Sequence, residues 1–410
     1  MIAMRCRLAW IMLLLSLLAT ERLAAEPWKR HVIDQSSRGA DGVRLADVNR
    51  DGRLDLVTGW EEGGRVRVYM NPGPRAAKKT WPAVTVGEVK SPEDAVFADL
   101  DGDGSQDVIS CCEGKVKSVF IHWAPRDQKT YLDAAAWSTA AITVVQGKQS
   151  WMYCLPMQVD GKHGIDLVVG SKGKGATVGW LQAPADPRKV ADWKFHPWYQ
   201  AGWIMSLESL DVDGDGDQDV VVSDRKGSRR GVLWLENPGA QSSLAGKAWR
   251  EHRVGADGLE VMFLAVADLD QDGRQDIVTT TRNKKLLFLR RQPPVATRWQ
   301  SHTIESPHGI LNGKSVAVAD IDGDGQLDLV HATNTFGNRS FPGVVWASYR
   351  KEPTESRWIP HDISGSRGVK FDLVQVLDLD GDGDLDVITC EERDNLGVFW
   401  YENPGSFPAP

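Results

Sequence analysis

The chain has 410 residues, of which 41% are apolar and 25% are charged, a composition typical of a globular protein with a sizeable core. Its formal net charge of -8 and its scattered basic residues argue against a nucleic-acid-binding surface, so no nucleic-acid partner is expected. Its five cysteines are too few for a disulfide framework, and we expect free buried thiols.

The first 25 residues differ in character from the rest. Two arginines precede an apolar run over residues 8–19, and two alanines follow it. This pattern is typical of a cleaved secretory signal, so we predict a signal peptide at residues 1–25 and a secreted or periplasmic mature chain at residues 26–410. Its removal takes away three arginines and one glutamate and changes the formal charge from -8 to -10. No later apolar stretch reaches about 18 residues, so no membrane span is expected.

One aspartate-rich, nine-residue motif recurs along the mature chain. Its spacings of 52, 59, 53, 57, 52 and 58 residues indicate one structural unit repeated seven times. The copies are DVNRDGRLD from Asp47, DLDGDGSQD from Asp99, QVDGKHGID from Gln158, DVDGDGDQD from Asp211, DLDQDGRQD from Asp268, DIDGDGQLD from Asp320 and DLDGDGDLD from Asp378.

Each repeat contains the signals of four strands. An apolar run such as VRLA or AVFA precedes the motif, and a run such as DLVTG or DVVVS completes it. A third apolar run ends in the turn sequence NPG, and a fourth begins with tryptophan and contains the pattern WxxH, as in RWQSHTI. Seven units of four antiparallel strands predict an all-β fold, a seven-bladed β-propeller.

The phase of the repeats predicts how the ring closes. Residues 28–34 form a fourth-strand segment ahead of the first motif, whereas the chain ends on a third strand, FWYENPG. We therefore expect the N-terminal strand to complete the last blade. Such a closure removes sheet edges that would otherwise be open to aggregation.

Six of the motifs carry a ligand set suited to calcium. Carboxylates at positions 1, 3, 5 and 9 of a tight loop supply hard oxygen ligands, and glycine at position 6 allows the turn. An EF-hand is excluded, because position 12 is never glutamate and strands flank the loop. The predicted ligands are Asp47, Asn49, Asp51 and Asp55; Asp99, Asp101, Asp103 and Asp107; Asp211, Asp213, Asp215 and Asp219; Asp268, Asp270, Asp272 and Asp276; Asp320, Asp322, Asp324 and Asp328; and Asp378, Asp380, Asp382 and Asp386.

The third motif departs from this set, because Gln158 and Lys162 replace two of its carboxylates. We therefore expect up to six calcium ions and none in the third blade. Six ions would add twelve positive charges and change the charge of the mature chain from -10 to +2. Calcium is accordingly predicted to be a structural cofactor that relieves repulsion at one end of the molecule.

The DxDGDGxxD loops on a propeller period, together with the NPG and WxxH strands, resemble the FG-GAP or VCBS repeat family of secreted propellers. The resemblance extends from Trp28 to Gly405. It implies that the aspartate loop joins the first and second strands of a blade and binds calcium. Because a fold does not determine an activity, the function is sought at the opposite face.

Two classes of function remain open at that face. The favoured one is a monomeric binding or interaction module that holds a glycan, peptide or protein ligand at the axial mouth. The alternative is a polysaccharide lyase or sugar dehydratase, as some propellers resembling this one are, using Tyr, His and Arg near the axis. Its candidate residues are Tyr153, His308 and Arg225, whereas the WxxH histidines are predicted to be structural.

The first strands predict which residues surround the mouth. The residues six positions before each leading motif residue are Asp41, Glu93, Met152, Met205, Met262, Lys314 and Asp372. This order predicts an acidic sector facing an apolar one, which suits a sugar or a basic peptide. The predicted ligand-binding residues are Asp41, Glu93, Asp372, Trp151, Trp203 and Met205. The alternative is that these are rim residues with no ligand.

Overall fold

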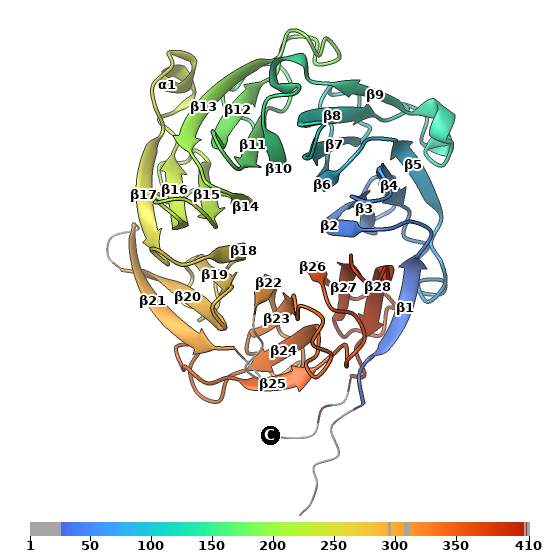
Figure 1. Ribbon diagram of the computed structural model, residues 1–410, viewed down its shortest axis with the longest axis vertical. Helices are drawn as coiled ribbons and strands as arrows, with labels where there is room; N and C mark the ends of the chain where they lie inside the picture. Colours follow the sequence, from blue (N-terminus) through green and yellow to red (C-terminus); the bar gives the residue numbers. More distant parts are fainter. Residues whose placement is uncertain (1–25, 294–296, 307–311, 406, 408–410) are drawn as a thin grey trace, which may run out of the picture.

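Seven four-stranded antiparallel sheets surround a central axis (Figure 1). The structure, a computed structural model, describes residues 26–293, 297–306, 312–405 and 407. This architecture confirms the predicted seven-bladed β-propeller. The predicted signal peptide lies outside the described residues. Within the described part of the chain, no helix is long and apolar enough to cross a membrane.

The two strands nearest the axis come from the two sides of each aspartate motif. The innermost strands are β2 (Ala40–Ala46), β6 (Pro92–Ala98), β10 (Ser150–Pro156), β14 (Ile204–Leu210), β18 (Val261–Ala267), β22 (Gly313–Ala319) and β26 (Phe371–Leu377). The second strands are β3 (Asp55–Trp60), β7 (Asp107–Cys112), β11 (Leu167–Lys172), β15 (Asp219–Asp224), β19 (Asp276–Thr281), β23 (Asp328–Thr333) and β27 (Asp386–Glu391).

The two outer strands of each blade follow. The third strands are β4 (Arg65–Tyr69), β8 (Ser118–Trp123), β12 (Thr177–Gln182), β16 (Gly231–Glu236), β20 (Lys285–Gln292), β24 (Val344–Ser348) and β28 (Gly397–Glu402). The outermost strands are β5 (Ala83–Gly87), β9 (Ser138–Ala141), β13 (Lys194–Gln200), β17 (Arg250–Gly255), β21 (Arg298–Glu305), β25 (Ile359–Asp362) and β1 (Lys29–Asp34). The helical segments in the described residues are α1 (Ala240–Leu244), η1 (Gln128–Thr130), η2 (Ala134–Ala136) and η3 (Thr143–Val145).

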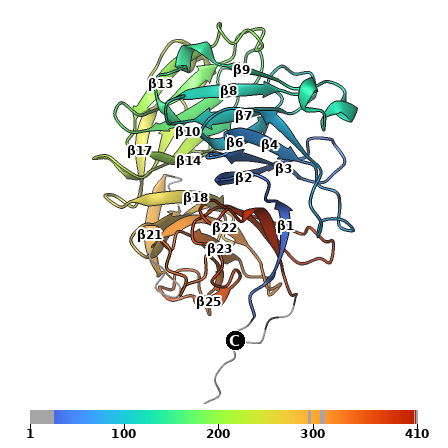
Figure 2. The same cartoon turned by 45° about the vertical axis from the view of Figure 1, so that its right-hand side comes forward.

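The ring closes as the sequence predicts. Strand β1 pairs antiparallel with β28, so the seventh sheet has the order β1-β28-β27-β26. Figures 1 and 2 show the N-terminal strand lying beside the C-terminal strand on the outer side of that blade. A segment from one end of the chain therefore completes the blade built by the other end, and this sheet presents no unpaired third strand.

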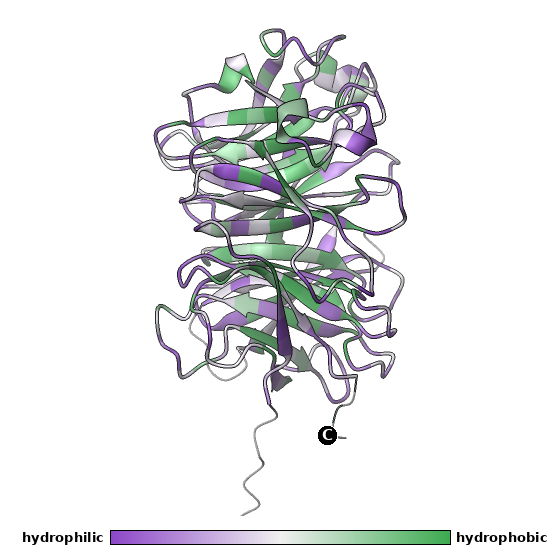
Figure 3. Ribbon diagram, turned by 90° about the vertical axis from the view of Figure 1, so that its right-hand side faces the viewer, coloured by the Kyte–Doolittle hydropathy of each residue, from purple (hydrophilic) through white to green (hydrophobic). Residues whose placement is uncertain are grey.

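Apolar side chains fill the space within and between the blades. One cluster combines Ile109 and Val119 of the second blade with Cys154 and Val169 of the third. In the edge-on view of Figure 3, hydrophobic residues lie within the strands and hydrophilic residues predominate in the loops at the two faces. All four cysteines in the described residues are buried and free, as expected from the sequence.

The WxxH histidines lie on outermost strands, where they pack against aromatic residues of the third strands. His31 stacks on Trp400 with ring centroids 4.5 Å apart, and its Nε2 lies 2.6 Å from a carboxylate oxygen of Glu402. His361 stacks on Trp346 at 3.8 Å. The other pairs are His196 with Trp180, His252 with Trp234 and His302 with Phe288. These contacts join the two outer strands of five blades.

The ninth residue of each aspartate motif is a buried aspartate that links three parts of its blade. In the first blade, one oxygen of Asp55 accepts the N–H of Val48 at 3.0 Å and the other accepts the N–H of Asn71 at 2.7 Å. Asn71 begins the NPG turn, and its side chain donates to the carbonyl of Leu54 and accepts from Gly73. The two signature motifs of the repeat therefore meet at one carboxylate, which we call the aspartate clasp.

The aspartate clasp recurs around the ring. In every blade the ninth aspartate accepts the N–H of the second motif residue, and in six blades it also accepts an N–H at the end of the third strand. These aspartates and their donors are Asp107 with Leu100 and Ala124, Asp166 with Val159 and Ala183, Asp219 with Val212 and Asn237, Asp276 with Leu269 and Arg291, Asp386 with Leu379 and Asn403, and Asp328 with Ile321.

We predict that Asp166→Asn lowers the free energy of unfolding by about 2 kcal/mol, because an amide cannot accept two N–H groups through two oxygens and leaves a buried donor unpaired. The third blade is the informative place, since its motif lacks the full carboxylate set. Chemical denaturation should give the same loss with and without a calcium chelator. The exposed Asp192→Asn is the control, and an equal effect of both substitutions would contradict the clasp.

Candidate functional site

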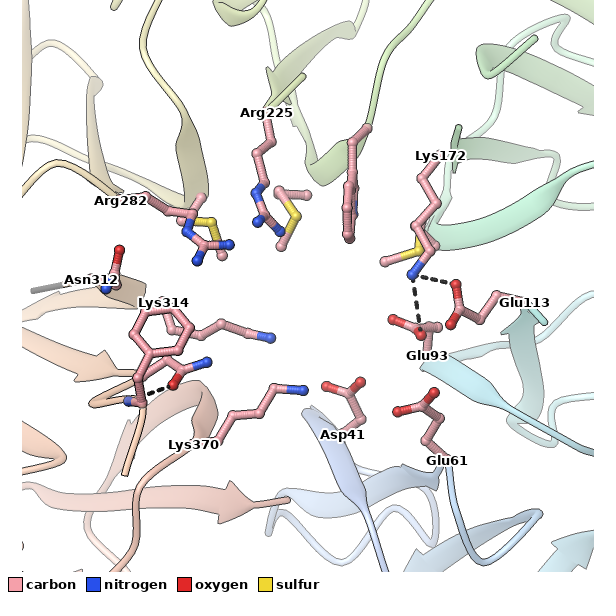
Figure 4. A pocket seen from close by; sticks show the side chains of 17 residues that line it. Asp41, Glu61, Glu93, Glu113, Lys172, Arg225, Arg282, Asn312, Lys314 and Lys370 are labelled. Carbon is pink, nitrogen blue, oxygen red and sulfur yellow. Dashed lines mark hydrogen bonds and ion pairs between the residues drawn. The ribbon is translucent and has the colours of Figure 1, made fainter. Parts of the chain in front are cut away.

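A cavity of about 320 Å³ lies at the axis, at the end of the propeller opposite the aspartate loops. The first strands begin at this end and the second strands finish here, so two positions of each repeat are brought to the cavity. Its lining includes four acidic and five basic side chains. Figure 4 shows Asp41, Glu61, Glu93 and Glu113 on one side and Arg225, Arg282 and Lys314 on the other.

The first ring of lining residues is the one that the alignment of the first strands predicts. We define it as the residues six positions before the leading motif residue. Six of the seven line the cavity, namely Asp41, Glu93, Met152, Met205, Met262 and Lys314. The seventh, Asp372, is buried directly below and borders a small void together with Asp41 and Lys314. The blades therefore superpose closely enough for the sequence register to hold at the axis.

Apart from Arg225, which was named above as a candidate near the axis, the second ring was not anticipated from the sequence. It consists of the residues six positions after the ninth aspartate, where each second strand ends. Its members are Glu61, Glu113, Lys172, Arg225, Arg282, Asn334 and Glu392, and all except Glu392 line the cavity. A second alignment, made on the ninth aspartate, would have found this ring. The sector that was expected to be apolar therefore contains three cations of the second ring beside its three methionines.

The acidic half, which we define as Asp41, Glu61, Glu93 and Glu113, crowds carboxylates together. Burial, with Asp372 adding to it, raises the pKa of Asp41 well above its usual value. Burial also raises the pKa of Glu93 to about 8, with Lys172 opposing the shift and Glu113 reinforcing it. Like charges in a poorly hydrated site favour the protonated form. This side of the cavity therefore holds more acidic groups than it can ionise near neutral pH.

Two lysines are ion-paired at the boundaries of the acidic half. Lys172 contacts Glu113 and lies 3.5 Å from Glu93. Lys314 Nζ lies 2.5 Å from Asp372. Burial alone would raise the pKa of Asp372, but Lys314 holds it below its usual value. Asp372 is thus the ionised member and Asp41 the protonated member of their pair.

The cationic half, defined as Arg225, Arg282, Lys314 and Lys370, faces the acidic half. Arg225 donates to Glu260 at 3.4 Å, and its guanidinium carbon lies 4.3 Å from the centre of the Trp203 ring. Burial lowers the pKa of Arg225, and Arg282 contributes to the shift. The guanidinium of Arg282 lies 5.2 Å from the ring centre of Phe336, which is half exposed.

A buried polar network lies below the cavity. Arg44 Nε donates to Asp94 at 3.2 Å, and Asp94 also accepts the N–H of Cys154 at 3.0 Å. The Arg44 guanidinium carbon is 4.0 Å from the ring centre of Tyr153, whose hydroxyl donates to Glu208 at 3.3 Å. Burial raises the pKa of Tyr153 well above its usual value. Tyr153 therefore acts here as a hydrogen-bond donor and is poorly suited to be a base.

The other predicted residues are placed as follows. Trp203 and Met205 line the cavity, but the Trp203 ring is approached by two cations, Lys172 at 4.6 Å and Arg225. Trp151 is fully buried and donates to the carbonyl of Val145, so it is a core residue and not a platform at the mouth. His308 lies outside the described residues, so its convergence with Tyr153 and Arg225 stays a prediction.

The aspartate loops at the other end have the chemistry of calcium sites. One oxygen from each of Asp99, Asp101 and Asp103 lies within 4.8 Å of the others, and the same holds for two further loop triads. Buried carboxylate oxygens of Asp99 and Asp380 have no hydrogen-bond partner among the described residues. A hard cation would satisfy such oxygens, so the residues fit calcium. The ninth aspartate, which the sequence predicts to be a calcium ligand, also forms the aspartate clasp through its two oxygens.

In the third loop, the hydrogen-bonded side-chain amide of Gln158 occupies the first motif position, which is an aspartate in the other six loops. The side-chain N–H group of Gln158 donates to the carbonyls of Lys162 and Gly164, at 3.2 and 2.7 Å. Its oxygen accepts the N–H of Asp160 and of Gly161. The Gln158 amide thereby links the backbone carbonyls of Lys162 and Gly164 across the loop. The loop keeps its shape through its own hydrogen bonds. That it binds no metal stays a prediction.

The family model of the FG-GAP-like repeat matches residues 47–110, 211–279 and 268–331. These segments are FG-GAP-like repeats. The resemblance drawn from the motifs is thereby confirmed. The matched segments contain five of the seven aspartate loops, and the loop from Asp268 belongs to two of them. Among curated proteins, no sequence matches the chain.

YCF48 and BBS1N, two solved structures, share the fold of this chain. YCF48 from Cyanidioschyzon merolae is similar with a TM-score of 0.54 at 12% identity, over 93% of this chain and 100% of that one. BBS1N, solved in complex with ARL6DN, has a TM-score of 0.52 at 10% identity, over 93% and 98%. An Agrocybe aegerita lectin specific for non-reducing terminal N-acetylglucosamine scores 0.43 at 15% identity, over 79% of each chain. At these identities the likeness concerns the fold alone.

We predict that Glu93 makes the protein less stable as the pH rises. Its carboxyl is protonated in the folded state up to about pH 8, whereas the unfolded chain loses this proton near pH 4.5. The folded state therefore binds the extra proton in this window, and the free energy of unfolding falls by on the order of 5 kcal/mol between pH 4.5 and 8.

Thermal unfolding of Glu93→Gln, which mimics the neutral acid, measures this contribution. The variant should lose less melting temperature than the wild type between pH 6 and pH 9. The exposed Glu88→Gln serves as the control and should follow the wild type. An identical pH dependence for all three proteins would show that Glu93 is ionised throughout.

Proposed function

We propose that this chain is a secreted, calcium-stabilised β-propeller that acts as a binding module and holds a small polar ligand, or the end of a glycan or peptide, in its axial cavity. The observation that carries the proposal is the concave site of about 320 Å³, in which charged groups from several blades converge. Converging polar groups in a partly enclosed site are costly to maintain and are typical of ligand recognition.

Binding is favoured over lyase or dehydratase chemistry by the state of the candidate base. A lyase needs a group that removes a proton near the bound sugar. The Tyr153 hydroxyl is instead engaged with Glu208, and its pKa is raised. The size of the cavity, at the lower end of the range for small-molecule sites, supports a ligand about as large as a monosaccharide or a dipeptide.

The cavity is tested by filling it. Glu61 lines it, whereas the neighbouring Glu62 is exposed at the surface. A calorimetric screen of monosaccharides, sugar acids, amino acids and dipeptides should find a compound that binds the wild type and Glu62→Trp. Glu61→Trp should abolish that binding while the melting temperature stays near that of the control. Equal binding by both variants, or no binder for the wild type, would contradict the proposal.

The calcium component is supported by the loop carboxylates that lack partners and is tested by metal content. Chelation should lower the melting temperature, because crowded carboxylates repel one another without the ion. Asp213→Ala should remove one ion. The double variant Gln158→Asp, Lys162→Asp restores carboxylates to the third loop and should bind one more ion than the wild type. Finding no bound calcium and no effect of chelation would refute this component.

A further inference from the structure

We propose that the ligand of the axial cavity is a small zwitterion, an amino acid or a dipeptide, with its ammonium group in the acidic half and its carboxylate in the cationic half. The inference rests on the proposed function and specifies the ligand. It starts from the separation of charge between the two halves, because the seven repeats supply the same positions but different residue types.

The acidic half has an unused acceptor. Glu61 lines the cavity, and its carboxylate makes no hydrogen bond or ion pair with any other described residue. Asp41, from the adjacent strand of the same blade, lies beside it, as Figure 4 shows. Ionised carboxylates are acceptors only, so they cannot form hydrogen bonds with one another. An ammonium group has three donors and no acceptor, so it can donate to several of them at once. A ligand cation would also favour ionisation of these crowded acids.

The cationic half presents two guanidinium groups to the cavity. Arg225 and Arg282 share one acidic neighbour, Glu260, at 3.4 and 3.9 Å. Each guanidinium has five donors arranged for a planar, two-oxygen acceptor. Figure 4 shows both side chains directed into the cavity from the side opposite Asp41. A carboxylate placed there would be held by the residue type that pairs best with it.

The two halves together favour a zwitterion over ligands that carry charge of one sign or none. A purely anionic ligand would gain from Arg225 and Arg282 but would supply no cation to Glu61 and the other acids, and a polyamine would supply no anion to the two arginines. A neutral sugar would leave the carboxylate of Glu61 without a charged partner. A zwitterion satisfies both halves at once, and the three methionines of the first ring provide apolar contact for the atoms between its charged ends.

Calorimetric titration of the full chain with alanylalanine tests the inference. N-acetylation removes the positive charge of this dipeptide and C-amidation removes its negative charge. We expect each blocked form to bind at least tenfold more weakly than the free dipeptide. Equal affinity of the free and blocked forms, or tighter binding of a neutral monosaccharide, would overturn the zwitterion while leaving the proposed binding function intact. Failure of every compound would overturn both.

Two variants assign the ends of the ligand. Glu61→Gln should weaken the free and C-amidated dipeptides at least fivefold but not the N-acetylated form, with Glu62→Gln as the control. Arg282→Gln should weaken the free and N-acetylated forms but not the C-amidated form, with the exposed Arg229→Gln as the control. Each variant's melting temperature reports whether it folds. A uniform loss for all three forms in either variant would contradict the assigned orientation.

Discussion

The structure depends on a buried carboxylate that holds the loop and the third strand of its blade together. Each ninth aspartate lies at the start of a second strand or, in blade three, directly before it. It accepts an N–H from its own loop, and in six blades it accepts another from the end of the third strand. A buried carboxylate is costly unless its oxygens are satisfied, and here backbone donors satisfy them. The blade end is therefore fixed in a geometry that does not itself require a metal. Blade three, where Gln158 stands in place of the leading aspartate, keeps the same clasp.

The aspartate clasp at the loop end of each blade also determines the geometry at the cavity end. First strands of seven residues and second strands of six connect the clasped loops to the axial cavity. A fixed loop therefore fixes the register with which the far ends of these strands reach the axis. The seven copies of one repeat position then form a ring, and the residue type can differ from copy to copy. In this chain the differences place acidic side chains on one side of the cavity of about 320 Å³ and basic side chains on the other. A rigid frame is needed for that, because flexible side chains of opposite charge would otherwise collapse onto one another.

The sequence predicted the fold, the ring closure and the first ring, because those features depend on a repeat period and a strand register. Apart from Arg225, the sequence did not predict the second ring, because that ring emerges only when the repeats are aligned on their ninth aspartate. Trp151 was placed at the mouth because it adjoins Met152, but neighbours in a strand point to opposite faces, and Trp151 enters the core. The ion pairs of Lys172 and Lys314 join different blades, and no local pattern reports such contacts.

Amide hydrogen exchange measures most directly whether the aspartate clasp, and not calcium, holds the blades. The relevant amides are those of the second motif residues, such as Val48 and Val212, compared with those of the sixth, such as Gly52 and Gly216, which donate to the leading aspartates. With a chelator present, the account predicts that the second-residue amides stay protected while the sixth-residue amides exchange quickly. Loss of protection at both sets together would show that the metal, and not the clasp, is what the blade depends on.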